Sequence, residues 1–469
     1  MASENSRVIL TVAETDEVDT PIATYVYSEQ KTAGDIKGKG RIDVISGPDS
    51  IQAFSSSIAG LLASRAVLQG VGVGDAAASP TSALLLHILQ DSSGRIATIL
   101  FAHRLGTALE PECKMYRLAA DVFNDVAMVL DCLSPLLRIR SARVALLSSA
   151  GVLRALCGVT GGSSKASLSA HFAKWGNIAE LNAKDSSQET IISLLGMLVG
   201  SLVVSHVTSV HATWAALFLL LTLHLSANYA AVRSVQMTSL NRQRANIVFS
   251  TLLDSDQELD LETLICGGRD TQDTPIKTWS RLYRTLRPEE VARRERIFER
   301  DGVLRWIPES LSSSQPVIGF CQIGGSLQDL VILMMNQRSS SSSPDLLHGL
   351  IRLFSLEAYV LFISHRANIP QAFIVLKKGC TPVQQLKAWT HALLVSRVLS
   401  RRTEEHSHLK QQQQHIFNIV TISYTLDFLN QDSRFERLYV QKLVEVGWDL
   451  NIAALETRPG RRITISSSS

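Results

Sequence analysis

Between Glu189 and Arg233 the chain has 43 consecutive residues without Asp, Glu, Lys or Arg. A helix rises about 1.5 Å per residue, so about 20 residues cross the hydrocarbon core of a bilayer. The window is therefore long enough for two crossings, one over residues 190–210 and one over residues 212–232, with a turn near residues 209–211. The pattern predicts a hairpin of two apolar helices that enters and leaves a membrane on the same side.

Basic residues flank the apolar window on both sides and set its expected orientation. By the positive-inside rule they place both outer ends on the cytosolic side of an intracellular membrane, whose organelle the sequence does not name. A second interpretation stays open, in which the window forms two core helices of a soluble bundle, because several Ser, Thr and His residues dilute its apolarity. The flanking cations are Lys165, Lys174, Lys184, Arg233, Arg242 and Arg244.

Composition agrees with a membrane-associated part joined to a soluble part. Hydrophobic residues make up 45% of the chain and the mean hydropathy is +0.12. The 46 basic and 43 acidic residues leave a net charge of +3, which argues against a nucleic-acid partner. The six cysteines are scattered and no Cys/His cluster has zinc-ligand spacing, so no disulfide scaffold and no metal site are predicted.

Periodicity and breakers predict a mainly α fold: an N-terminal, small-residue-rich helical bundle that holds the apolar hairpin, followed by a small α/β domain. We expect an irregular leader over residues 1–48, the helical domain over 49–253 with the hairpin at 190–232, and a charged linker and helix over 254–300. The α/β domain spans 301–457 with a Ser-rich insertion at 338–344, and residues 458–469 form a disordered tail.

The expected elements follow from apolar spacing and from Gly and Pro residues between the runs. Helices are expected in the first part at residues 51–62, 82–89, 94–105, 116–133, 142–158, 165–174, 187–205, 211–237 and 243–255. Strands are expected in the second part at 303–307, 316–323, 358–364 and 371–376, and helices there at 326–336, 345–356, 383–399, 415–430 and 434–446.

Two carboxylates on an otherwise apolar helix form the first candidate site. Asp121 and Asp125 are four residues apart and share a helix face, with Asn124 beside them. Such a pair can bind a cation or relay a proton, because a carboxylate in an apolar environment is costly unless it is paired or functional. The alternative is a structural polar stripe that pairs with Arg117, Arg138 or Arg140.

A Gly-rich segment before an expected helix forms the second candidate. Gly161, Gly162, Ser163 and Lys165 would place backbone N–H groups and a cation where a phosphate or carboxylate can bind. The spacing differs from that of a Walker A loop. Close packing through the small residues is the alternative interpretation.

A dense polar block next to the apolar window is the candidate that we rank first. A charged and amidic cluster at a membrane boundary can hold a polar ligand, and the lysine can meet a phosphate or an aldehyde. Its ligand-binding candidates are Lys184, Asp185, Gln188 and Glu189. Ser186 or Ser187 is expected to cap the helix that follows.

Gly196 and Gly200 form a small-xxx-small surface in the first half of the window. We expect them to pack against the helix at 212–232 or against a partner chain. His206, His211 and His224 do not share a helix face, so they predict no metal site.

Four segments in order resemble the hallmark segments of the root UVB sensitive family, which is defined by a domain of unknown function. They are LAADVFNDVAMVLDCLSP (118–135), ALCGVTGGSSKASLSAHFA (155–173), NIAELNAKDSSQET (177–190) and LHLSANYAAVRSVQMTSLNRQR (223–244). The resemblance runs from about residue 54 to residue 248, and a weaker one covers 386–399 and 446–457. The leader up to residue 48 lacks the family's longer entry segment.

The resemblance implies a membrane-associated eukaryotic protein. It connects plant members to seedling responses to ultraviolet-B, vitamin B6 homeostasis and auxin transport, and implies that some members act in pairs, so a homo- or hetero-oligomer with a family member is expected. It supplies neither a reaction nor catalytic residues, and no cofactor is named. We expect a non-enzymatic protein that binds or moves a small polar ligand, or assembles with a family partner. The alternative is an enzyme acting on a phosphorylated or carboxylated small molecule near Gly161 and Lys184.

Overall fold

A computed structural model gives the structure of the chain. It divides into two compact units: the first comprises residues 1–103 and 113–234, and the second comprises residues 104–112 and 235–469. The described residues are 6–15, 21–30, 39–45, 49–71, 80–173, 176–256, 259, 284–307, 316–336, 343–367, 369–405 and 411–464. Residues 338–342 of the expected Ser-rich insertion and most of the expected 254–300 linker lie outside them, whereas residues 343 and 344 belong to a helix.

Three strands form an antiparallel sheet where the sequence predicts an irregular leader. They are β1 (Ser6–Thr15), β2 (Pro21–Gln30) and β3 (Lys39–Ile45), in the order β1-β2-β3. The leader is therefore not irregular throughout. Its Val, Ile, Thr and Tyr residues favour extended backbone, and the β-leaning run noted at residues 22–27 lies inside β2.

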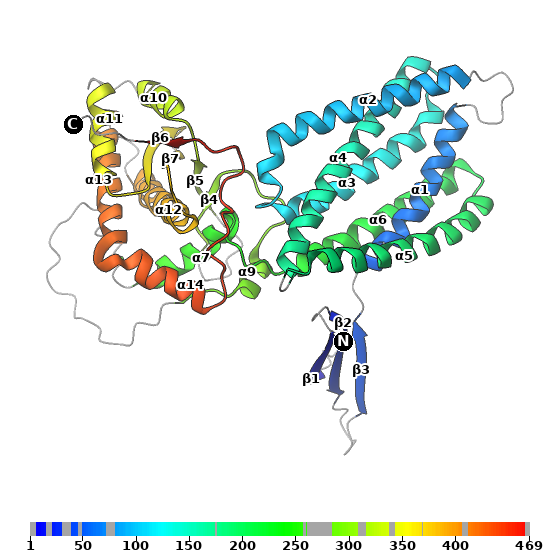
Figure 1. Cartoon of the computed structure of the whole chain (residues 1–469), viewed down its shortest axis with the longest axis horizontal. Coiled ribbons are helices and arrows are strands. Elements are labelled where there is room, and N and C mark those ends of the chain that lie inside the picture. Colours follow the sequence, from blue (N-terminus) through cyan, green and yellow to red (C-terminus); the bar gives the residue numbers. More distant parts are fainter. Residues whose placement is uncertain are drawn as a thin grey trace. The chain divides into compact units, whose positions relative to one another are not determined.

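Six long helices build the rest of the first unit, as the predicted N-terminal helical bundle requires (Figure 1). They are α1 (Asp49–Val71), α2 (Pro80–Leu105), α3 (Cys113–Leu133), α4 (Arg140–Phe172), α5 (Ile178–His206) and α6 (Val210–Ser234). Short 3-10 turns follow α2 and α3 at Gly106–Ala108 and Ser134–Leu136.

Glycines that were expected to separate helices lie inside continuous helices instead. The expected break before Gly94 falls within α2, and the break at Gly161 and Gly162 falls within α4, so each expected pair of helices is one helix. A glycine inside a helix costs roughly 1 kcal/mol relative to alanine, which tertiary packing can offset. Gly94 is such a case, because an added Cβ would lie 3.1 Å from the Cβ of Ala155 in α4.

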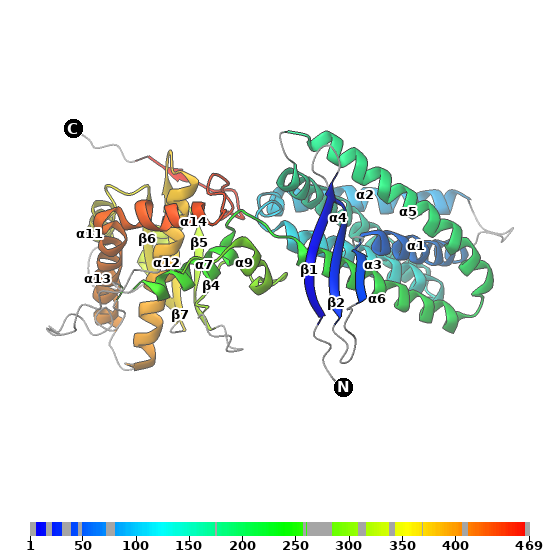
Figure 2. The same cartoon turned by 90° about the horizontal axis from the view of Figure 1, so that it is seen from below.

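Helix α1 packs against α3, α5 and α6, which makes it the centre of the bundle (Figure 2). Gly196 and Gly200 of α5 are buried against it. An added Cβ on Gly196 would lie 2.8 Å from Ser57 Cβ, and one on Gly200 would lie 2.7 Å from Leu61 Cδ1. The two glycines thus allow a close helix contact, but with α1 and not with the helix at 212–232 that we expected.

The turn between α5 and α6 lies at residues 207–209 and is held by Arg65 of α1. Its guanidinium donates to the backbone oxygens of Val204 and Val207 at 2.8 and 2.7 Å and to Thr213 Oγ1 at 2.9 Å. The last carbonyls of a helix have no partner within the helix, so Arg65 satisfies the end of α5 and fixes the start of α6. Arg65 thus fastens the end of α5 and the start of α6 to α1.

Four helices of the described chain are long and apolar enough to cross a membrane. They are α1 over 50–70, α4, α5 and α6, and in the apolar window of α5 only 11% of the residues are buried. Leucine, isoleucine and phenylalanine side chains point outward along α5 and α6, among them Leu198, Leu202 and Leu219, which are 59, 63 and 72% exposed. The residues described here therefore do not wrap the 190–232 window as a soluble core would.

The second unit contains a small mixed sheet, in agreement with the predicted α/β domain. Its strands are β4 (Val303–Arg305), β5 (Val317–Ile323), β7 (Ile369–Lys377) and β6 (Tyr359–Arg366) in that order. β5 and β7 are parallel, whereas β4 and β6 run antiparallel to their neighbours. A fifth strand, β8 (Arg462–Ile463), pairs with β7, so part of the expected disordered tail is ordered.

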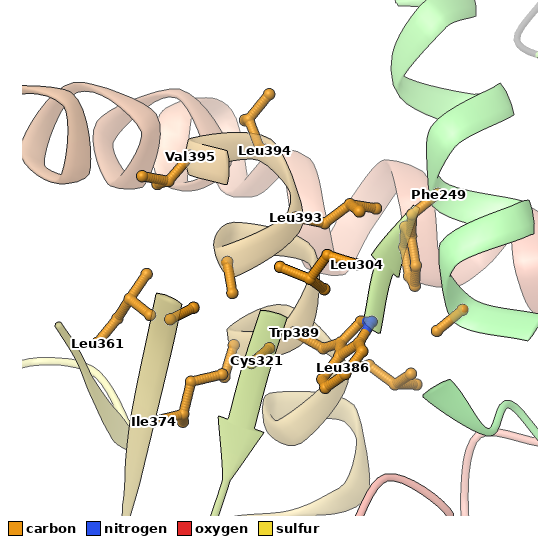
Figure 3. Packing of buried hydrophobic residues seen from close by; sticks show 14 of the residues in the cluster. Phe249, Leu304, Cys321, Leu361, Ile374, Leu386, Trp389, Leu393, Leu394 and Val395 are labelled. Carbon is orange, nitrogen blue, oxygen red and sulfur yellow. The ribbon is translucent and has the colours of Figure 1, made fainter. Parts of the chain in front are cut away.

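Helices surround this sheet and close its core. They are α7 (Arg242–Ser255), α9 (Pro288–Arg294), α10 (Leu327–Asn336), α11 (Ser343–Leu353), α12 (Pro382–Glu405), α13 (Gln411–Asn430) and α14 (Gln441–Glu445). A 3-10 turn at Gln431–Ser433 and a π-helix at Arg434–Val440 lie between the last two. Helix α12 lies on the sheet and is almost wholly buried, with Trp389 and Leu393 facing Leu304 and Ile374 (Figure 3). Helix α7, which we expected in the first domain, packs on α12 and β4.

Candidate functional site

Five polar side chains meet inside the helical bundle of the first unit. Gln52 comes from α1, Asp121 and Asp125 come from successive turns of α3, and His224 and Asn228 come from successive turns of α6. Each of them is at most 8% exposed. We call these five residues the buried polar cluster. The i, i+4 spacing within α3 and α6 places each pair on one face, as the sequence predicts for the two aspartates.

Hydrogen bonds join the cluster across three helices. Asp121 Oδ2 accepts from the side-chain amides of Gln52 and Asn228, the latter at 2.5 Å. Asp125 Oδ1 lies 2.8 Å from His224 Nδ1. The hydrogen-bond partners described for the two aspartates are therefore uncharged amides and an imidazole, while Arg117, which the alternative interpretation named, acts on Asp121 through its charge.

The imidazole of His224 bridges the two carboxylates. Its Nδ1 contacts Asp125, and its Nε2 lies 3.5 Å from Asp121 Oδ2. A neutral imidazole donates through one nitrogen only, whereas an imidazolium donates through both and is attracted by both carboxylates. His224 can therefore donate a hydrogen bond to both carboxylates only when both of its ring nitrogens carry a proton.

One acceptor in the cluster has no partner. Asp125 Oδ2 is buried and has no hydrogen bond to any described residue. An unsatisfied buried carboxylate oxygen costs free energy, so such an atom in a native site indicates strain, chemistry or a missing partner. A ligand donor or a proton at Asp125 would satisfy it.

The candidate site from the sequence contains two of the five residues of the buried polar cluster, Asp121 and Asp125. Asn124, expected beside the aspartates, is only partly buried and has no part in these bonds. His224 was set aside because it shares no face with the other histidines, and 99 positions separate it from Asp125. The available signal was an apolar helix carrying His224 and Asn228 at i, i+4, a spacing that matches Asp121 and Asp125.

The polar block that we ranked first lies on the surface of α5. The helix begins at Ile178, so Ser186 and Ser187 are within it and do not cap it. Lys184 pairs with Glu180 at 3.0 Å, and Gln188 is exposed. Asp185 and Glu189 lie 2.6 and 3.0 Å from Lys165 of α4. Lys165, from the Gly-rich candidate, therefore pairs with Asp185 and Glu189 of the polar block. These contacts form a partly exposed ion-pair network between α4 and α5.

The Gly-rich candidate is not a loop before a helix, because residues 158–165 lie within α4. Their backbone N–H groups belong to the helix and are not available for an anion. Gly161 packs against α3, where an added Cβ would lie 3.5 Å from Ala120 Cβ. An added Cβ on Gly162 would meet no atom within 4 Å. The packing interpretation, which we held as the alternative, accounts for Gly161.

No group of three or more His, Cys, Asp or Glu side chains within the described ranges has an arrangement that could hold a metal ion. The buried polar cluster consists of hydrogen-bonding groups. It contains acceptors, amide donors and one imidazole, which suit a proton or a small polar ligand.

A second set of buried charges supports the fold of the second unit. The side chain of Asn241 accepts from the backbone N–H of Arg244 at 2.9 Å and caps α7, and Arg244 pairs with Glu295 at 2.9 Å. Asn241 also donates to Glu112 Oε2 at 3.1 Å. Burial raises the pKa of Glu112 from 4.5 to about 7, against the opposing charges of Arg244 and Arg242. These contacts join the start of α7 to the rest of its unit.

Comparison with known proteins places the buried polar cluster within a recognised domain. A family model described as "Vitamin B6 photo-protection and homoeostasis domain" matches residues 47–256. The chain is 44% identical over 206 residues to "RUS family member 1" of Dictyostelium discoideum, covering 43% of this chain and 38% of the relative. It is 29% identical over 362 residues to "Protein root UVB sensitive 3" of Arabidopsis thaliana, covering 76% and 72%.

A further relative is "Protein root UVB sensitive 2, chloroplastic" of Arabidopsis thaliana, 24% identical over 54% of this chain and 60% of the relative. The chain thus spans between 38 and 72% of the length of these three relatives. No solved structure matches it. The matched domain contains every residue of the buried polar cluster and the four segments that carried the resemblance, so residues 47–256 are similar to the domain that the root UVB sensitive proteins share.

Proposed function

We propose that residues 49–234 insert into an intracellular membrane and that the buried polar cluster binds a small polar ligand there, without catalysing a reaction. The observation that carries this proposal is the cluster itself: two carboxylates and an imidazole, all buried, held between helices whose outer surfaces are apolar. A role in vitamin B6 homeostasis follows the name of the matching domain.

The cost of the cluster supports a functional role. Ionisable groups buried among apolar helices are expensive and are retained mainly where they pair with each other or handle a substrate or proton. Here the two aspartates and the histidine pair, yet Asp125 Oδ2 stays without a partner among the described residues. A purely structural cluster would be more stable with that oxygen satisfied or with an apolar residue in place of Asp125.

The chemistry of the cluster limits the ligand class. Two carboxylates beside one imidazole favour a ligand that donates hydrogen bonds or carries a positive charge. Pyridoxine, pyridoxal and pyridoxamine have hydroxyl groups and a ring nitrogen that accepts a proton, so they fit this requirement. Phosphorylated vitamers carry negative charge toward the carboxylates and are expected to bind less well.

The membrane part of the proposal rests on exposed apolar surface. Large hydrophobic side chains along α2, α5 and α6 point away from the bundle, where lipid would cover them. A second family member is the other occupant to consider for the exposed face of α5. Cross-linking of the chain in native membranes separates the two, because a lipid-facing α5 yields no defined protein adduct.

Binding to the purified full-length protein in lipid nanodiscs tests the proposal. Pyridoxine, pyridoxal, pyridoxamine and pyridoxal phosphate are added in turn and the melting temperature is followed. We expect the three unphosphorylated vitamers to raise the melting temperature. In Asp125→Asn, at least a tenfold higher vitamer concentration should be needed for the same rise. Asp91→Asn is the matched control, because Asp91 lies on the exposed surface of α2 in an ion pair with Arg95. Equal responses of the two variants, or no response of the parent protein, would reject the site.

A further inference from the structure

The second unit contains a pocket that is separate from the buried polar cluster. It has a volume of about 500 Å³ and lies between α11, β6 and α13, outside the region matched by the family model. Volumes of roughly 300–1,000 Å³ are usual for sites that take small molecules. The residues that line it all belong to these three elements.

Most of the pocket wall is apolar. Leu350 and Leu353 of α11 face Phe362 and Ile363 of β6, and Ile422 of α13 completes the wall. Phe362, Ile363 and Ile422 are at most 3% exposed and belong to the core of the unit, so this side is rigid. Such a wall selects a ligand body that is itself apolar.

One polar side chain among these apolar groups is incompletely satisfied. Asn418 lines the pocket and is 4% exposed. Its Nδ2 lies 3.5 Å from the backbone oxygen of Ile363 and 3.4 Å from His365 Nδ1. Its Oδ1 has no hydrogen bond to any described residue. A buried carbonyl oxygen without a partner favours a ligand that donates a hydrogen bond to it.

The charges around the pocket restrict the ligand further. Burial lowers the pKa of His365, so the imidazole next to Asn418 is neutral. Arg352 is the charged residue of the lining and is exposed to solvent, where water screens its charge. An interior without charge favours an uncharged ligand.

We propose that this pocket binds an uncharged small molecule with an apolar body and one hydroxyl or N–H group, which donates a hydrogen bond to Asn418 Oδ1. The proposal is independent of the membrane site, because no residue of the buried polar cluster takes part. It assigns the second unit a ligand-binding role of its own.

Photolabelling of the full-length protein in nanodiscs tests the proposal, since the position of the adduct separates the pocket from lipid and from the first unit. The probe is a long-chain primary alcohol with a diazirine in its chain, and the control probe is its methyl ether, which cannot donate. We expect adducts on peptides that contain residues 346–363 and 418–423. One hydrogen bond contributes about 0.5–1.5 kcal/mol, so the alcohol should label these peptides about 2- to 10-fold more than the ether.

Three variants locate the effect. Gly349 lines the pocket and an added Cβ would meet no atom within 4 Å, so Gly349→Phe is expected to fill the space without a clash and to abolish labelling. Val420→Phe adds similar bulk on the 57% exposed face of α13 and should leave labelling unchanged. Asn418→Leu should keep the labelling and remove the preference for the alcohol.

Several results would overturn the proposal. These are adducts that avoid both peptides, equal labelling by alcohol and ether in the parent protein, or labelling that persists in Gly349→Phe.

Discussion

At the scale of single residues, the buried charges of this protein meet specific partners, and those partners are distant in sequence. The spacing of Asp121 and Asp125 predicted a shared face and the structure places both on it. The spacing of His224 and Asn228 marks a polar face on α6, but no local pattern shows that this face meets α3, so the pairing was missed. Lys184 and its neighbours were ranked first because the family resemblance is sharpest at this polar block, whereas its solvent exposure is not visible in the sequence.

Replacing His224 tests the energetics of the buried polar cluster. In His224→Leu the two aspartates lose the imidazole that bridges them and stay buried, so we expect a loss of about 3–5 kcal/mol in the free energy of unfolding. Chemical denaturation of the protein in detergent measures it. His211→Leu is the control, because His211 is exposed at the start of α6. A loss below about 1 kcal/mol would show that the pairing contributes little.

Glu112 predicts a specific dependence of stability on pH. Burial raises its pKa from 4.5 to about 7, so the folded state holds a proton that the unfolded chain releases near pH 4.5. The stability from this proton is complete below pH 4.5 and is lost as the pH rises through 7. Glu112→Gln should therefore melt at a higher temperature than the parent protein at pH 8 and at a similar temperature at pH 4.5.

Thermal melts of the second unit, followed by tryptophan fluorescence, measure this difference. Glu110→Gln is the matched control, since Glu110 is exposed two positions away and its replacement should cause no such pH-dependent change. A Glu112→Gln melting temperature that is lower than that of the parent at pH 8 would contradict a pKa of Glu112 that burial raises.

At the scale of secondary structure elements, the strands of the second unit were predicted well, whereas β1, β2 and β3 were missed as an irregular leader. The four expected strands of the second unit overlap β4, β5, β6 and β7 because short β-branched and aromatic runs between Gly and Pro have few alternatives. The breaks predicted inside α2 and α4 failed for a physical reason. Glycine lowers helix stability by only about 1 kcal/mol, and Gly94 packs against Ala155 of α4 while Gly161 packs against Ala120 of α3.

Alanine substitutions at two glycines should change stability in opposite directions. In Gly196→Ala the new Cβ would lie 2.9 Å from the backbone oxygen of Phe54, so we expect a loss of about 1–3 kcal/mol as α1 and α5 separate. In Gly158→Ala the new Cβ meets nothing within 4 Å, and helix propensity should give a gain of about 0.5–1 kcal/mol. Unfolding in detergent compares them, and a neutral Gly196→Ala would mean that the α1–α5 contact is loose.

At the scale of the whole molecule, the chain joins two units of different chemical character. The first exposes long apolar helices, whereas the second has an apolar core around Trp389 enclosed by polar helices. Composition and the 43-residue uncharged window predicted this division. The place of α7 was not predicted, because its sequence resembles that of a helix of the first unit while Arg242 and Arg244 pair with Asp301 and Glu295 of the second.

The central claim is that residues 49–234 lie in a membrane. Alkaline carbonate extraction of membranes from cells that express the full chain tests it most directly, because high pH releases peripheral proteins and leaves inserted ones with the lipid. We expect the intact protein to stay in the membrane pellet, together with a known membrane-spanning marker. Recovery of the intact protein in the supernatant with a peripheral marker would contradict the claim.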